Sequence, residues 1–201
     1  MADFFMGFDE PTGLRGFARS MNMRFVEGEV DRQYAHDVPG GVPALPLFKH
    51  GDRSRIADMC YGNFGGLPCQ VFTFDGVAYP DDPGHDRRTC ILFTVPANFA
   101  TLSVSPHSKL SRLQERTKSP FSQRFRVVGR DPEVAALLLD EGMQRWLMAS
   151  DEHLRLEFQG NAILGHSRMT AVEDLPVILQ QVYGVYLRVP DKAWDRYGIL
   201  V

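Results

Sequence analysis

A chain of 201 residues can bury roughly 70% of the surface that its unfolded form exposes, which is sufficient for one hydrophobic core. Its composition, 44% hydrophobic and 23% charged residues, excludes an intrinsically disordered chain. The net charge of -3 argues against wholesale binding to nucleic acid. We therefore expect a single globular domain over residues 1–201, with nucleic acid not favoured as a partner.

The cysteines and the apolar runs indicate where the protein resides. Cys60, Cys69 and Cys90 are odd in number and lack C-x-x-C spacing, so the sequence predicts neither a disulfide framework nor a zinc ribbon. The longest apolar run, 134–139, is far shorter than the ~20 residues of a membrane span. The N-terminal decapeptide lacks the cationic start of a signal peptide. These features predict no transmembrane segment and a reducing, cytoplasmic location.

The first quarter of the chain contains few strong structural signals. Thr12 is a candidate N-cap for a short helix that places Leu14, Phe17 and Met21 on one side, and a short strand follows at 23–26. Residues 37–55 are rich in proline and glycine, which predicts a long loop. Loops of this length in compact domains are commonly functional or loosely held.

Residues 56–75 predict a β-hairpin about Gly65-Gly66, because two apolar segments flank the glycine pair. Alternation predicts that one face of the hairpin forms the core; its members are Ala57, Met59, Tyr61, Phe72 and Phe74. A third strand is expected at 89–95, ended by Pro96, and a separate short strand at 101–105.

Residues 121–147 predict a strand that runs into a helix. Phe121, Phe125 and Val127 would share the apolar face, while Arg124 and Arg126 would share the solvent face. The run 131–133, Asp-Pro-Glu, supplies an N-cap acceptor, a pre-set φ and negative charge in the first turn, so a helix must follow. Gly142 is a candidate break within that helix.

The last third of the sequence predicts a second hairpin, a helix and a short terminal helix. The segments 153–158 and 161–168 flank a Gln-Gly-Asn turn. Leu175, Ile178, Leu179, Val182 and Tyr186 mark a helix that stops before Pro190, and Asp191 is the expected cap of the last helix. The fold class is therefore α+β: a mostly antiparallel sheet built from two hairpins and connecting strands, with helices packed on one face.

Three framework motifs carry a resemblance. The pattern G...G.P..VFTFD over 62–75, LSVSP over 102–106 and F...FRV...DPEVAALLL over 121–139 resembles a group of uncharacterised bacterial proteins, across roughly residues 56–188. The resemblance implies a bacterial source and a similar α+β domain, and it transfers no catalytic residues. Many of those proteins bear an N-terminal membrane anchor, so it also implies association with the cell envelope.

The sequence contains two partial motifs for catalysis or metal binding, and neither matches its pattern well. The run 165–169, Gly-His-Ser-Arg-Met, approaches the G-x-S-x-G elbow but lacks its second glycine and the strand–turn–helix context. Asp81, Asp82, His85 and Asp86 are metal-capable side chains, but they lie in a turn-rich segment whose aspartates serve the backbone. No metal site and no cofactor are therefore predicted.

A basic segment is the strongest candidate for a binding surface. Residues 109–130 carry seven arginines and lysines against a single acidic residue, Glu115. The charge run by itself favours a merely solvated face. If the protein binds an anionic partner through one surface, whether an acidic protein, a lipid headgroup or nucleic acid, that surface is expected to include Arg112, Arg116, Arg124 and Arg126. The sequence thus favours a non-enzymatic binding or accessory module. A hydrolase with a site assembled near the 37–55 loop and an envelope-associated accessory protein are the alternatives.

Overall fold

The computed structural model describes residues 13–30, 45–49, 55–76, 86–107, 119–150, 153–168 and 170–199. Six antiparallel strands form one sheet: β1 (Arg24–Val30), β2 (Arg55–Phe64), β3 (Leu67–Gly76), β4 (Asp86–Pro106), β5 (Phe125–Gly129) and β6 (Arg155–Arg168). The helices of the described residues are α1 (Leu14–Ser20), α4 (Pro120–Arg124), α5 (Pro132–Leu138), α6 (Glu141–Ala149), α7 (Leu175–Tyr186) and α8 (Asp191–Tyr197), with two 3-10 turns, η1 (Pro46–Lys49) and η2 (Val172–Asp174). The predicted α+β class with an antiparallel sheet is confirmed. Among the described helices, none is long and apolar enough to cross a membrane.

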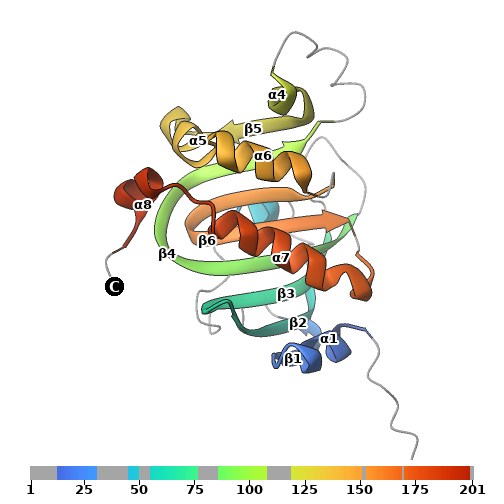
Figure 1. Cartoon of the computed structure of the whole chain (residues 1–201). Coiled ribbons are helices and arrows are strands. Elements are labelled where there is room, and N and C mark those ends of the chain that lie inside the picture. Colours follow the sequence, from blue (N-terminus) through green and yellow to red (C-terminus); the bar gives the residue numbers. More distant parts are fainter. Residues whose placement is uncertain are drawn as a thin grey trace, which may run out of the picture.

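The sheet is buried on both faces, so it has two cores. The first core lies between the sheet and the helices; it includes Phe93, Leu102, Phe158, Leu179 and Val182. The second core lies on the opposite face beneath η1, and its members are Leu45, Leu47, Ile56, Met59, Phe72, Phe74, Cys90, Leu92, Ala162 and Leu164. Figure 1 shows α5, α6 and α7 on one side of the strands. The α-helices therefore cover one face, as expected, and η1 contributes to the cover of the other.

The predicted hairpin is confirmed as β2 and β3, but its faces differ from the prediction. Gly65 and Gly66 connect the strands with φ values of 59° and 84°, a conformation that glycine adopts without steric cost. The register shifts between Ala57 and Cys60, where Asp58 has φ 50°. This bulge places Ile56, not Ala57, on the face of Met59 and Phe72. The opposite face is equally buried, because Cys60, Cys69 and Val71 enter the first core.

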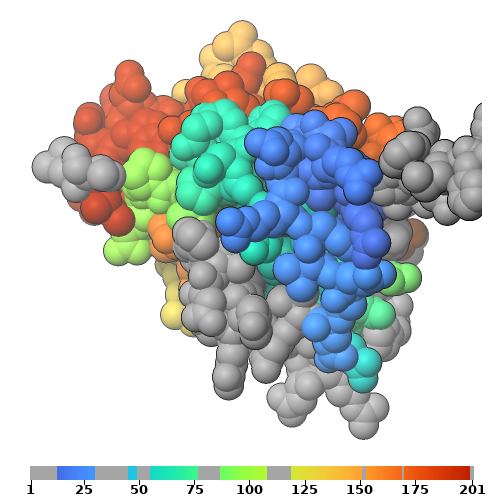
Figure 2. Space-filling view, turned by 90° about the horizontal axis from the view of Figure 1, so that it is seen from below, coloured from blue at the N-terminus to red at the C-terminus, as the bar shows by residue number. Residues whose placement is uncertain are grey.

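The N-terminal helix and strand close the lower end of the sheet. β1 pairs with β2, and α1 packs beside it, with the backbone N–H of Met23 donating to the carbonyl of Ala18 at 2.7 Å. Seen from below, this blue segment lies against the teal hairpin (Figure 2). The predicted helix and strand are both present, although the helix is preceded by Gly13 as its N-cap.

β4 is one strand of 21 residues, so the prediction that Pro96 ends it is wrong. Proline lacks an N–H donor, but here it lies at an irregularity where the β4–β6 register shifts, between Thr94 and Phe99. The backbone N–H of Ile199 donates to the carbonyl of Pro96 at 2.9 Å, and Ala97 bridges Gly198. The segment after α8 thus covers the strand edge where proline interrupts the ladder.

β6 is also continuous, so the second predicted hairpin is not formed. The two arms of β6 on either side of the bend pair with β4 and not with each other. Gly160, with φ 56°, lies opposite Phe99 and marks a bend. The β4–β6 ladder pairs Thr94 with Ala162 and Leu102 with Phe158. Between these two pairs the chain advances eight positions along β4 but only four along β6. β4 therefore curves around the outside of β6 (Figure 1).

Residues 121–124 are helical, which corrects the predicted strand over 121–128. Ser119 is the N-cap of α4, and its hydroxyl accepts a hydrogen bond from the backbone N–H of Ser122 at 3.2 Å. Proline at the first helical position further favours the turn. The strand starts only at Phe125, and Phe121 is buried from the helix rather than from the sheet.

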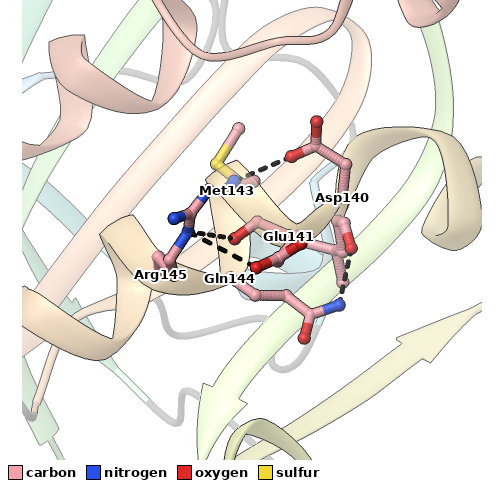
Figure 3. Close-up of polar contacts among 6 residues, drawn as sticks. Asp140, Glu141, Met143, Gln144 and Arg145 are labelled. Atoms are coloured by element: carbon pink, nitrogen blue, oxygen red, sulfur yellow. Dashed lines mark hydrogen bonds and ion pairs between the residues drawn. The ribbon is translucent and has the colours of Figure 1, made fainter.

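The predicted Asp131 cap is confirmed, and the helix that follows divides in two. The Asp131 carboxylate accepts from the backbone N–H of Glu133 at 2.9 Å. The break falls before Asp140, not at Gly142, because Asp140 caps α6 by accepting from the backbone N–H of Met143 at 2.8 Å (Figure 3). Gln144 Nε2 donates to the carbonyl of Leu139 at 2.7 Å and closes the end of α5.

The last two helices are close to their predicted positions. α7 carries Leu175, Ile178, Leu179 and Val182 into the first core, and it lies across β6 (Figure 1). Gly165 of β6 allows this contact, since a Cβ there would lie 2.2 Å from Cγ2 of Val182. α8 begins at Asp191 with Pro190 as its N-cap, so Asp191 is the first helical residue and not the cap.

Candidate binding sites

The two described arginines of the predicted basic surface have different environments. Arg124 is the last residue of α4 and half-buried; it donates to the carbonyl of Met148 and, at 2.9 Å, to that of Ser150. Its guanidinium also lies 5.1 Å from the centre of the Phe125 ring. Arg124 thus satisfies the carbonyls at the end of α6 and does not share a strand face with Arg126. Arg112 and Arg116 lie outside the described residues.

β5 is the terminal strand of its half of the sheet. Its ladder with β4 pairs Ser105 with Arg126 and Val104 with Val127, and the sheet order of the described strands ends there. Val127 and Val128 are 37% and 50% exposed, and Arg126 is exposed beside them. Arg130, which follows the strand, is exposed as well. Two β-branched side chains between two cations therefore mark an accessible strand edge.

A buried polar cluster lies on the second-core face. Glu157 and His166 are both fully buried, and Glu157 Oε1 lies 3.8 Å from His166 Nε2. The backbone N–H of Leu47 donates to Glu157 Oε2 at 3.0 Å, which anchors η1 to β6. Burial lowers the pKa of His166, against the opposing effect of Glu157, so the imidazole is neutral at pH 7. The cluster includes Arg88, 2% exposed, and all three side chains lie in the interior, away from solvent.

The three cysteine thiols are buried and unpaired. Burial, with a smaller effect of Asp58, raises the pKa of Cys60 to about 12. Burial likewise raises the pKa of Cys69 and of Cys90 far above the ordinary thiol value. A nucleophilic cysteine needs a thiolate, so these side chains do not provide one at neutral pH. Cys60 and Cys69 face the same core and act there as small apolar side chains.

A pocket of about 370 Å³ lies between the ends of β6 and the first turns of α7. Its lining residues are His153, Ser167, Arg168, Thr170, Ala171, Asp174, Val177, Ile178 and Gln181. The Ser167 hydroxyl donates to the carbonyl of Arg168 at 3.0 Å and lies 2.9 Å from Thr170 Oγ1. These bonds occupy the hydroxyl group, and they close the end of the strand. The segment that weakly resembles a nucleophile elbow is therefore the end of β6, beside a pocket, and not a strand–turn–helix elbow.

Sequence reasoning placed Ser167 and His166 on opposite faces of a strand, which the structure confirms: Ser167 lines the pocket and His166 faces the second core. It missed the pocket itself, because Asp174 and Gln181 join Arg168 only through the packing of α7 on β6. Of the 37–55 loop only 45–49 and Arg55, the first residue of β2, are described, and Asp81, Asp82 and His85 lie outside the described residues. Within the described part of the chain no group of three or more metal-binding side chains occurs.

Comparison with known proteins identifies one relevant fold. No family model matches the chain, and no curated protein matches its sequence. Among solved structures, the chain is similar to the mycobacterial trehalose monomycolate transport factor A, TtfA, with a TM-score of 0.63 and 11% sequence identity. The match covers 88% of this chain and 94% of that chain. The two proteins therefore share a fold over nearly their whole lengths.

Proposed function

We propose that this chain is a non-enzymatic accessory module that binds an extended, acidic segment of a partner protein along β5. The observation that carries the proposal is the accessible edge strand with Val127 and Val128 exposed between Arg126 and Arg130. An edge strand offers unpaired backbone N–H and C=O groups to a further strand. The module acts by holding its partner and performs no chemistry itself.

Charge and side-chain type determine which segment fits this edge. Val127 lies on one face of β5, and Arg126 and Val128 lie on the other. A strand added to β5 brings every second side chain beside Val127, where β-branched or aromatic residues pack well. Its other side chains meet the face of Arg126, with Arg130 beyond the strand end, so carboxylates are favoured and lysines are repelled there. The sequence composition also supports a negatively charged partner, since residues 109–130 contain seven cations and one acidic residue. Arg124 is not part of this surface because it binds the end of α6.

The fold likeness supports an accessory role in transport. The solved neighbour is a transport factor, and its fold extends over 88% of this chain. The motif resemblance to uncharacterised bacterial proteins points to association with the bacterial cell envelope. Three buried thiols support a cytoplasmic location for the module.

A defined peptide tests the proposal directly. The probe is a fluorescent peptide of alternating glutamate and valine, compared with a peptide of alternating lysine and valine, in anisotropy titrations against the whole chain. We expect binding of the acidic peptide only, and a further loss of affinity between ~50 and ~200 mM salt because exposed charges are screened. The Arg126→Glu, Arg130→Glu double variant should bind the acidic peptide at least tenfold more weakly. Equal binding of both peptides would contradict the proposal.

The matched control for this test is Arg145→Glu. Arg145 is an exposed arginine of α6 and not of β5, and its Nε lies 3.9 Å from Glu141 Oε1 (Figure 3). Arg145→Glu makes the same charge change as each of the two replacements in the β5 double variant, and it should leave peptide binding unchanged. If Arg145→Glu weakened binding as much as the β5 variant, the effect would be one of net charge and not of the β5 edge.

A further inference from the structure

The pocket between β6 and α7 has the composition of a small-ligand site. Its volume of about 370 Å³ lies in the range typical of such sites. It opens where the two ends of the bent strand β6 approach α7, since His153 precedes the strand and Ser167 and Arg168 end it. One wall is therefore a strand end, and the other is a helix face.

The helical wall is polar at its ends and apolar between them. Asp174, Val177, Ile178 and Gln181 follow the i, i+3, i+4, i+7 spacing of one helix face. Val177 is 58% exposed, although it lies beside the pocket and not on an isolated surface. An exposed branched aliphatic side chain at a pocket rim is available to pack against an apolar group of a ligand.

Opposite charges face this space from its two walls. Arg168 is the last residue of β6 and Asp174 is the N-cap of α7, and both are exposed residues of the lining. Neither side chain forms an ion pair within the part of the chain that the structure describes. The Gln181 Oε1 atom is buried and has no hydrogen-bond donor among the described residues. The pocket therefore holds a cation, an anion and an acceptor that do not satisfy one another.

We infer that this pocket binds a small zwitterion with an apolar side chain, namely an α-amino acid or a dipeptide. The ligand carboxylate pairs with Arg168, whose guanidinium binds carboxylates in a two-pronged geometry. The ligand ammonium pairs with Asp174, and the apolar side chain packs against Val177 and Ile178. A ligand with only one charge leaves the other pocket charge without a partner, so the two charges together select for the zwitterion.

The first test varies the ligand on the unaltered protein. L-leucine is titrated into isotopically labelled whole chain and followed by amide chemical shifts, beside 4-methylpentanoic acid, which lacks the ammonium group, and 3-methylbutylamine, which lacks the carboxylate. We expect saturable shifts at residues of the pocket for L-leucine, and at least tenfold weaker binding for each analogue. Similar affinity of L-leucine and either analogue would overturn the inference. So would the absence of saturable shifts with both L-leucine and the dipeptide Leu-Leu at ~10 mM.

The second test removes one pocket charge at a time. Arg168→Gln and Asp174→Asn replace exposed side chains, and both variants should unfold at the same temperature as the parent. Each should weaken L-leucine binding at least tenfold, and the matched controls Arg145→Gln and Asp195→Asn should leave it unchanged. Binding that persists in both pocket variants would place the ligand elsewhere. Because this pocket is distinct from the β5 edge, the result is independent of the acidic-peptide test.

Discussion

Glu157 and His166 come from opposite sides of the bend in β6, and their side chains meet with Oε1 and Nε2 3.8 Å apart in the protein interior. Glu157 also accepts the backbone N–H of Leu47, so the pair joins both arms of the bent strand to η1. The charges of the buried Arg88 and of Arg155 on β6 also lower the pKa of His166. The protonation of one imidazole is therefore linked to the stability of the bend.

Acid should destabilise the protein through His166. Its pKa is lowered in the folded state from 6.5, so the unfolded chain binds the proton more readily. The contribution is fully present above pH 6.5 and is lost as the pH falls below it, with a slope that approaches about 1.4 kcal/mol per pH unit. Urea unfolding between pH 7 and 5 should show this slope in the parent and a smaller slope in His166→Gln. His153→Gln, an exposed control, should keep the slope of the parent; equal slopes in all three would refute the assignment.

Replacing Phe72 with alanine should cost about 3 to 5 kcal/mol of unfolding free energy, because a buried aromatic side chain is lost. Phe72 is 1% exposed in the second core, and its ring centre lies 6.1 Å from that of Phe48. Chemical denaturation measures the change. The control Val128→Ala, at an exposed position, should alter stability by less than about 0.5 kcal/mol. A loss below about 1 kcal/mol in Phe72→Ala would contradict its place in the core.

Gly165 should not tolerate a methyl group while Val182 is present. The added Cβ would lie 2.2 Å from Cγ2 of Val182, so Gly165→Ala should cost about 1 to 3 kcal/mol through overpacking. Shortening the partner in Gly165→Ala, Val182→Ala should restore part of that loss, giving a favourable coupling energy in a double-mutant cycle. Strictly additive effects would show that α7 does not pack on this part of β6.

Arg124→Ala should destabilise the chain by about 1 to 3 kcal/mol, because the carbonyls of Met148 and Ser150 lose their donor. Arg126→Ala should change stability much less, since that side chain is exposed. Thermal and urea unfolding distinguish the two. The reverse order of effects would return Arg124 to the binding surface and Arg126 to the scaffold.

All three thiols should be free and protected in the native state. A chromogenic disulfide reagent at pH 8 should react slowly with the folded protein, since burial raises the pKa of each thiol. The same reagent in denaturant without reductant should count three thiols per chain. A count of one would reveal a disulfide and an oxidising compartment.

Local signals predicted the elements that local chemistry controls. The Gly65-Gly66 turn, the Asp131 cap and the apolar spacing of α7 each lie within a few residues of the structure that they determine. Prediction failed at Pro96 and at the Gln-Gly-Asn turn, because β4 and β6 continue through these positions only by bending together. Ser119 and Pro120 are typical of a helix start and indicate α4 correctly. The apolar alternation of Phe125 and Val127 led instead to the prediction of a strand from residue 121.

The candidate sites were less predictable than the fold. Val127 and Val128 are exposed because β5 is the last strand of its half of the sheet. The order of strands in a sheet cannot be predicted from the residues of one strand. The pocket brings Arg168 and Asp174 together across a helix–strand contact. Arg124 was misplaced because its partners, the carbonyls of Met148 and Ser150, are 24 and 26 residues away in the chain.

The unequal path lengths in the bend restrict how this fold can change length in evolution. On β4 the residues of the first core carry odd numbers up to Phe99 and even numbers from Leu102, and on β6 the change falls between Phe158 and Ile163. Inserting one residue in the outer path would turn Leu102 and Val104 to the opposite face, whereas inserting two would not. Homologues should therefore gain or lose residues between 95 and 101 in pairs.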